Sequence, residues 1–145
     1  MAVGTQLDKE LLIKLVQNRT GWAESLLRSL SPESLSEVYK YILKNIAVDK
    51  ASVSYRADSL PFTVPFKIRN KLNLTKGDRF GIVCRRLENE IVLDPNLPYK
   101  VKMYSNNIIK LPGILYDRKL LREKDDVFVR VEGDKIVLKS FTYMI

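Results

Sequence analysis

Residues 65–80 read PFKIRNKLNLTKGDRF, and residues 112–127 read PGILYDRKLLREKDDV. Both stretches begin with proline, place isoleucine or leucine at matching positions, and carry an aspartate, Asp78 or Asp125, at the same place. Beyond the end of each stretch, IVL occurs at 91–93 and again at 136–138, each time after a short polar segment. Residues 112–138 therefore repeat the pattern of residues 65–93, which predicts an internal duplication.

Each repeat predicts the same order of elements. A short strand, at 62–64 or 108–111, ends before a proline, one or two helical turns follow, and a tight turn leads into a β-hairpin. The hairpin tips, Glu88-Asn89 and Gly133-Asp134, consist of residues that favour turns. The first hairpin is two residues longer, and an even number keeps each side chain on its face. One unit alone would leave open strand edges, so we expect the two units to close on each other.

The hairpin strands show a period of two. Phe80, Ile82 and Cys84 share one face, and the three valines at 127–131 share the equivalent face of the second hairpin. Cys84 is therefore interpreted as a small core residue rather than a reactive thiol. It is the only cysteine of the chain, so no intrachain disulfide can form.

The first fifty residues follow a helical period instead. Apolar residues recur at helical spacing in three runs, which cover residues 7–16, 22–30 and 35–46. Trp22 is interpreted as a core residue of a small helical unit, with an interface anchor as the alternative. The apolar stripes exceed what three short helices can bury among themselves. We therefore expect these helices to form a homodimer interface or to hold a protein partner.

The chain is strongly basic. Its 145 residues include 25 Lys and Arg against 17 Asp and Glu, a formal net charge of +8, and its isoelectric point is about 9.6. Residues 1–50 contribute only +1, so the excess belongs to the remainder of the chain. Such an excess attracts polyanions such as nucleic acid or an anionic membrane surface. A membrane surface is disfavoured because the excess does not lie along an amphipathic helix.

Several classes of function lack the residues they need. The chain contains no histidine, which excludes histidine-based catalysis and histidine metal sites, and no phosphate-binding glycine motif occurs. The acidic cluster Glu123, Asp125 and Asp126 is interpreted as turn residues rather than a magnesium site. We therefore expect neither an enzyme nor a cofactor. No apolar run approaches the roughly 20 residues of a membrane span, and the N-terminus is unlike a signal peptide, which favours a cytoplasmic protein without a membrane partner.

The pattern Pro-x-x-Ile-Arg-x-x-Leu-x-Leu-x-x-Gly-Asp at residues 65–78, with REKDDVFVRVEGDKIVLKS at 122–140, resembles the SpoVT–AbrB swapped-hairpin family. The resemblance covers about residues 58–95 and 105–140 and does not explain the first fifty residues. Together with the helical pattern of residues 1–50, it implies an α+β fold in which an N-terminal helical segment precedes a barrel at residues 51–145. The barrel would consist of two βαββ swapped-hairpin units, near 54–97 and 101–140, that close into one β-barrel. A double-psi barrel is the structural alternative, because it too can be built from duplicated halves.

Members of this family are prokaryotic DNA-binding regulators and the antitoxin halves of toxin–antitoxin pairs. The resemblance therefore implies a prokaryotic (bacterial, archaeal or viral) transcriptional regulator that binds double-stranded DNA. The alternative is an antitoxin-like or other protein-binding module that uses the N-terminal helices. A binding face would consist of the strand before each proline and the short helix after it, where cations contact phosphates and base edges.

The expected DNA-binding residues are all basic and lie on or beside these two elements in each unit: Arg56, Lys67, Arg69, Lys71, Lys102, Lys110, Arg118 and Lys119. Arg69 occupies the Ile-Arg position of the motif, so it is expected to contribute most. The second unit is the weaker candidate for DNA binding, because Tyr116 and Asp117 stand where the first unit has Arg69 and Asn70. Neither unit has the Gly-Arg pair that often precedes the strand in this family.

Overall fold

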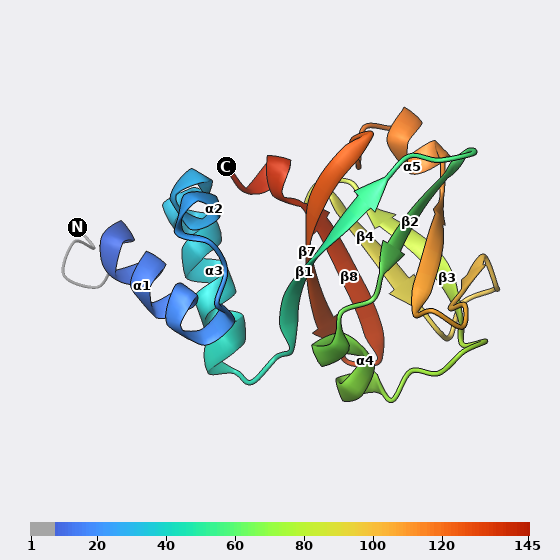
Figure 1. Ribbon diagram of the computed structural model, residues 1–145, viewed down its shortest axis with the longest axis horizontal. Helices are drawn as coiled ribbons and strands as arrows, with labels where there is room; N and C mark the ends of the chain where they lie inside the picture. Colours follow the sequence, from blue (N-terminus) through green and yellow to red (C-terminus); the bar gives the residue numbers. More distant parts are fainter. Residues whose placement is uncertain (1–7) are drawn as a thin grey trace. The chain divides into compact units, whose positions relative to one another are not determined.

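A computed structural model describes residues 8–145 and divides the chain into two units (Figure 1). The first unit extends to Ile46 and includes Met144–Ile145, and the second comprises Ala47–Tyr143. The sequence places this boundary after residue 50, but strand β1 (Val48–Ser54) begins earlier because Val48 already pairs with Arg130. Residues 1–7, which include Leu7 of the first predicted helical run, lie outside the described residues.

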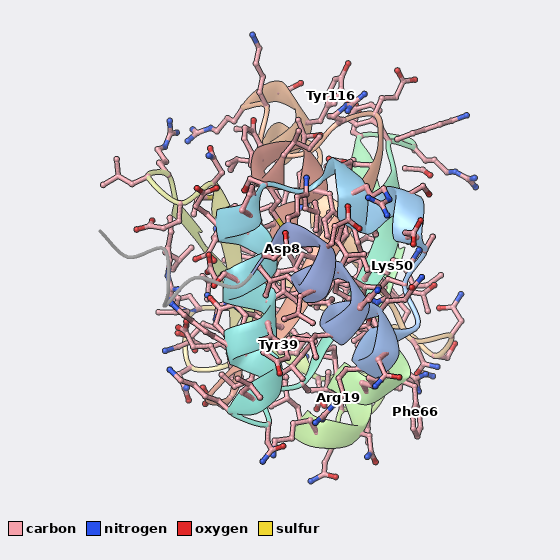
Figure 2. The ribbon with its side chains drawn as sticks, turned by 90° about the vertical axis from the view of Figure 1, so that its left-hand side faces the viewer. Asp8, Arg19, Tyr39, Lys50, Phe66 and Tyr116 are labelled. Carbon is pink, nitrogen blue, oxygen red and sulfur yellow. The ribbon has the colours of Figure 1, made fainter. Side chains whose placement is uncertain are left out.

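The first unit contains three helices, α1 (Lys9–Thr20), α2 (Glu24–Ser29) and α3 (Pro32–Leu43). In Figure 2, Asp8 lies at the start of α1, Arg19 near its end, and Tyr39 on α3. Helix α3 has a typical N-cap, because the Ser31 hydroxyl accepts a hydrogen bond from the Ser34 N–H at the start of the helix. Trp22 is buried, as its core interpretation predicts. The other buried apolar residues of the three helices and their links are Leu12, Ile13, Val16, Leu27, Leu30, Leu35 and Val38.

The second unit is built on one antiparallel sheet of eight strands, which makes the fold class α+β. The strands are β1, β2 (Ser59–Thr63), β3 (Arg79–Arg85), β4 (Glu90–Asp94), β5 (Val101–Lys102), β6 (Ile108–Pro112), β7 (Lys124–Glu132) and β8 (Lys135–Ser140). Their order is β5-β3-β4-β8-β7-β1-β2-β6. The sheet closes almost completely into a barrel, because a bridge joins Met103 after β5 to Ile109 in β6.

Strand pairing follows the same pattern in both halves of the barrel. Strand β1 pairs with β7 of the other half, and β3 pairs with β5 of the other half. The pairs β2–β6 and β4–β8 also join the two halves, through Phe62 opposite Ile109 and Val92 opposite Val137. Each half thus supplies the partners that the edge strands of the other half need.

Two short helices connect the strands. Helix α4 (Phe66–Leu72) follows β2, and helix α5 (Ile114–Asp117) follows β6. They lie at opposite ends of the barrel, as the positions of α4 and α5 in Figure 1 and of Phe66 and Tyr116 in Figure 2 show. A short 3₁₀ helix, η2 (Phe141–Met144), follows β8. Within residues 8–145, no helix has the length and apolar character needed to cross a membrane.

The barrel core confirms the predicted alternation. Phe80 is buried, and Ile82 and Cys84 on the same face pack against the core. The predicted difference between the hairpins is also present: residues 86–89 separate β3 from β4, whereas only Gly133 and Asp134 separate β7 from β8. Gly133 has φ +64°, a left-handed backbone conformation that glycine adopts without steric cost.

Candidate nucleic-acid interface

Helix α4 presents two of the predicted lysines on a supported frame. Its Ile68 is fully buried, and Asn73, with φ +52°, ends the helix in a left-handed cap. Lys67 and Lys71 are four residues apart and both exposed, so they occupy one face of the helix. The helix carries no acidic residue, and its lysines therefore have no carboxylate partner within it.

Arg69 is held by contacts that the sequence does not reveal. Its Nε–H donates a hydrogen bond of 2.9 Å to the Val64 carbonyl, and its guanidinium lies 5.5 Å from the centre of the Phe66 ring. The first contact joins α4 to the end of β2, and the second is a cation–π interaction. Arg69 is therefore partly committed to the protein itself. Phe66 remains 66% exposed beside it.

A second cluster of cations lies on the β5–β6 hairpin. The ammonium groups of Lys102 and Lys110 lie 5.3 and 5.0 Å from the centre of the Tyr104 ring. The bridge between Met103 and Ile109 explains this geometry, because it sets the neighbouring lysines on the outer face while both bridge residues are buried. The structure thus brings two of the predicted residues together around one tyrosine.

Val64 connects this hairpin to α4. Its N–H donates to the Asn107 carbonyl at 2.9 Å, while its own carbonyl accepts from Arg69. The sequence stretches that meet here, 59–77 and 95–116, contain no aspartate or glutamate. We call this part of the barrel the cationic surface, and it comprises Lys67, Arg69, Lys71, Lys102 and Lys110.

Two further residues extend the cationic surface, and sequence reasoning missed both. Arg79 stands opposite Lys102 in the β3–β5 pair, and its guanidinium lies 5.0 Å from the centre of the Tyr99 ring. Tyr99 is 51% exposed. The sequence does contain a signal for a binding surface here, because the stretch 95–116 combines three lysines and three tyrosines and has no carboxylate.

The remaining predicted residues, Arg56, Arg118 and Lys119, lie at the other end of the barrel. The β1–β2 turn that carries Arg56 is held beside α5, because the Gly113 N–H donates to the Asp58 carbonyl at 3.0 Å. Acidic side chains accompany this group, since Asp58 lies in the turn and Asp117 directly precedes Arg118. The eight predicted residues therefore form two groups, and the cations of the α5 end have carboxylates nearby.

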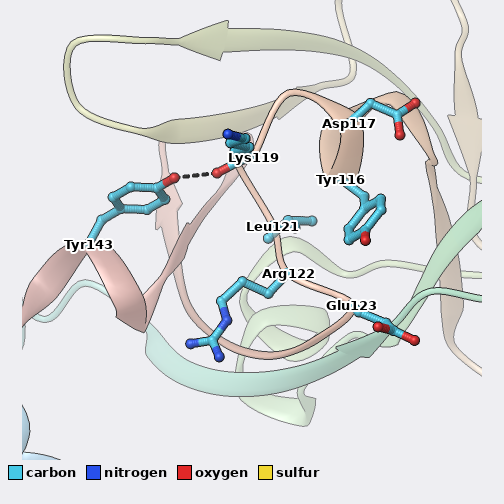
Figure 3. Close-up of a pocket in the computed structure, with 7 residues that line it drawn as sticks. All are labelled: Tyr116, Asp117, Lys119, Leu121, Arg122, Glu123 and Tyr143. Atoms are coloured by element: carbon cyan, nitrogen blue, oxygen red, sulfur yellow. Dashed lines mark hydrogen bonds between the residues drawn. The ribbon is translucent and has the colours of Figure 1, made fainter.

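Lys119 also lines an open cavity of about 620 Å³, shown in Figure 3. Its backbone has φ +62°, and its carbonyl accepts a hydrogen bond from the Tyr143 hydroxyl. The cavity wall mixes both charges: Lys119 and Arg122 on one hand, Asp117 and Glu123 on the other. This cavity therefore shows no preference for a polyanion.

Four charged residues form a cluster on the hairpins. Its two arginines bind carboxylates of the protein and are therefore not available to a ligand. Arg85 binds Glu132 and Glu90, and Arg130 binds the same two carboxylates at 3.0 Å each. The hydrogen bonds from Arg85 lower the pKa of Glu132 to about 2. These contacts join β3, β4 and β7, so their role in the fold is structural.

Comparison of the chain with protein-family models, with curated proteins and with solved structures found no match.

Proposed function

We propose that this protein binds double-stranded DNA through the cationic surface and acts as a prokaryotic (bacterial, archaeal or viral) transcriptional regulator. The observation that carries the proposal is the grouping of five cations near α4, on segments without carboxylates that the hydrogen bonds of Val64 join. Cations in such a place neutralise phosphates and release counterions, which is the main source of affinity for duplex DNA. Carboxylates at the α5 end make that end the weaker candidate.

The barrel is proposed to be a tandem of two swapped-hairpin units, as in the SpoVT–AbrB family. The equivalent pairing of strands in the two halves supports this reading. Asp78 and Asp125 support it as well, because each accepts a hydrogen bond from the N–H of the residue three positions before it, Thr75 or Arg122. A duplicated unit keeps such a turn in both copies.

Within this proposal, Lys67 and Lys71 contact phosphates from a helix that is fixed by the buried Ile68. A fixed helix matters because the side chains then lose less conformational freedom on binding than they would from a mobile loop. Arg69 fixes the junction of β2 and α4 and offers only the part of its guanidinium that Val64 does not use. Phosphate contacts set affinity, and any reading of bases would need base-edge contacts in addition.

The test compares the two ends of the barrel. The double variant Lys67→Ala/Lys71→Ala should bind a duplex about tenfold more weakly at low salt, because two phosphate contacts are removed. The matched control Arg118→Ala/Lys119→Ala removes the same charge from the α5 end and should bind nearly as the unaltered protein does. Equal losses in both variants, or no loss in either, would show that the cationic surface is not the binding face.

A further inference from the structure

We propose that the part of the cationic surface around Tyr99 and Tyr104 binds single-stranded nucleic acid by stacking unpaired bases on these rings. The inference rests on the proposed function, because it concerns the same surface. It adds that this surface also binds nucleic acid in single-stranded form. Tyr99 is 51% and Tyr104 is 39% exposed, and both side chains lie beside the outward-facing cations of β3, β5 and β6.

Each ring comes with its own cations. Arg79 lies 5.0 Å from the Tyr99 ring centre, and Lys102 and Lys110 lie 5.3 and 5.0 Å from that of Tyr104. A base stacked on either ring therefore has its phosphate within reach of a positive charge. Alternation of aromatic rings and cations along a groove or face is the arrangement by which proteins hold single strands without sequence preference.

The cations on the outside of the barrel are arranged in a line that can follow the backbone of one nucleic-acid strand. Arg79 and Lys102 stand directly opposite each other in β3 and β5, and Lys102 is joined to Lys110 through Tyr104. These cations form a row across three neighbouring strands. The stretch 95–116 contributes no carboxylate that would repel a backbone laid along this row.

A duplex could not use the tyrosines in this way. Its bases are paired and stacked on one another, so their faces are hidden from side chains that stand on a sheet. Lysines alone would suffice for a duplex backbone, and the two exposed rings would then contribute little. Unpaired bases expose the faces that the rings can cover, and each such stack typically strengthens binding by about fivefold or more.

The test uses the full chain and three labelled probes: oligo(dT) of about 15 nucleotides, oligo(rU) of the same length, and a mixed-sequence duplex, each followed by fluorescence anisotropy. Oligo(dT) and oligo(rU) distinguish DNA from RNA as the source of the single strand. We expect at least one of them to bind. Tyr104→Ala should weaken that binding about fivefold or more, while Tyr104→Phe, which keeps the ring, should bind as the unaltered protein does.

Tyr116→Ala is the matched control, because Tyr116 is 38% exposed, nearly the same as Tyr104, but lies on α5 at the other end of the barrel. It should leave the affinity unchanged. The inference is overturned if neither single strand binds, if Tyr104→Ala binds normally, or if Tyr104→Phe or Tyr116→Ala loses as much as Tyr104→Ala. Binding of a single strand without binding of the duplex would refute the proposed duplex function and leave this inference standing.

Discussion

Arg85 and Glu132 bind each other, with the Nη atoms of Arg85 3.1 and 2.5 Å from the Oε atoms of Glu132. Arg85 is the last residue of β3 and Glu132 the last of β7, so each immediately precedes a hairpin turn and the two positions are equivalent in the repeat. Two identical halves would place like charges at this contact. The opposite charges instead favour pairing of the first half with the second.

Removing this contact should destabilise the barrel. Arg85→Ala loses the hydrogen bonds to Glu132 and Glu90, and we expect the free energy of unfolding to fall by about 1–2 kcal/mol. Arg86→Ala, one residue further on and exposed in the turn, should change it by less than about 0.5 kcal/mol. Urea denaturation followed by circular dichroism measures both, and equal midpoints for Arg85→Ala and Arg86→Ala would contradict the expectation.

The same cluster predicts how stability depends on pH. The pKa of Glu132 falls from an ordinary 4.5 to about 2 in the folded chain, first because of its hydrogen bonds from Arg85. A carboxyl group with a lowered folded pKa stabilises the protein above pH 4.5, and that contribution is lost as the pH falls from 4.5 towards 2. Glu132→Gln should therefore flatten the loss of stability over this interval. Glu88→Gln, exposed in the adjacent turn, should leave the profile unchanged; parallel profiles for Glu132→Gln and the unaltered protein would refute the assignment.

Gly113 is required by a close approach of the β1–β2 turn. A Cβ atom at this position would lie 2.5 Å from the Asp58 carbonyl oxygen, so Gly113→Ala should destabilise the barrel by about 2 kcal/mol. Phe66 occupies the equivalent position in the first repeat, directly after Pro65, and its side chain is 66% exposed. Phe66→Ala is thus the control and should alter the midpoint of thermal unfolding little. A normal midpoint for Gly113→Ala would show that the turn can move away.

The repeat in the sequence was enough to predict a β-barrel and six of its eight strands, whereas β1 and β5 were not predicted. Prolines, turn aspartates and period-two runs are local signals, and they mark the starts of helices and the tips of hairpins directly. The start of β1 was not predictable in the same way. The segment VDKASVS at 48–54 lacks a clear alternation, and it becomes a strand because β7 provides a partner for every one of its residues.

The candidate site was predictable only in part. Sequence position indicated Lys67 and Lys71, but the commitment of Arg69 to Val64 depends on the angle between β2 and α4. The grouping of Lys102, Lys110 and Tyr104 depends on the register of a single bridge. Arg118 and Lys119 share the basic character of the other residues, and only the path of the chain places them directly after α5, which lies at the opposite end of the barrel from α4. Local patterns carry no information about such distances.

Homodimerisation through the helical unit remains a prediction. Leu11 on α1 is 44% exposed and Leu43 on α3 is 58% exposed. If these residues contribute to a dimer interface, Leu11→Glu/Leu43→Glu should lower the mass seen by light scattering from dimer to monomer, because charges are costly in a buried apolar contact. Leu87→Glu, at a hairpin tip where Leu87 is 95% exposed, is the control and should not change the mass. A double variant with the mass of the unaltered protein would place the interface elsewhere.

The salt dependence of duplex binding by the unaltered protein is the most direct test of the cationic surface. With the five cations Lys67, Arg69, Lys71, Lys102 and Lys110 on phosphates, the logarithm of the association constant should fall against the logarithm of salt concentration with a slope of about −4.5. Lys67→Ala and Lys71→Ala should each reduce the magnitude of this slope by about one. No duplex binding at low salt, or binding that does not change with salt, would contradict the proposal that this surface binds DNA.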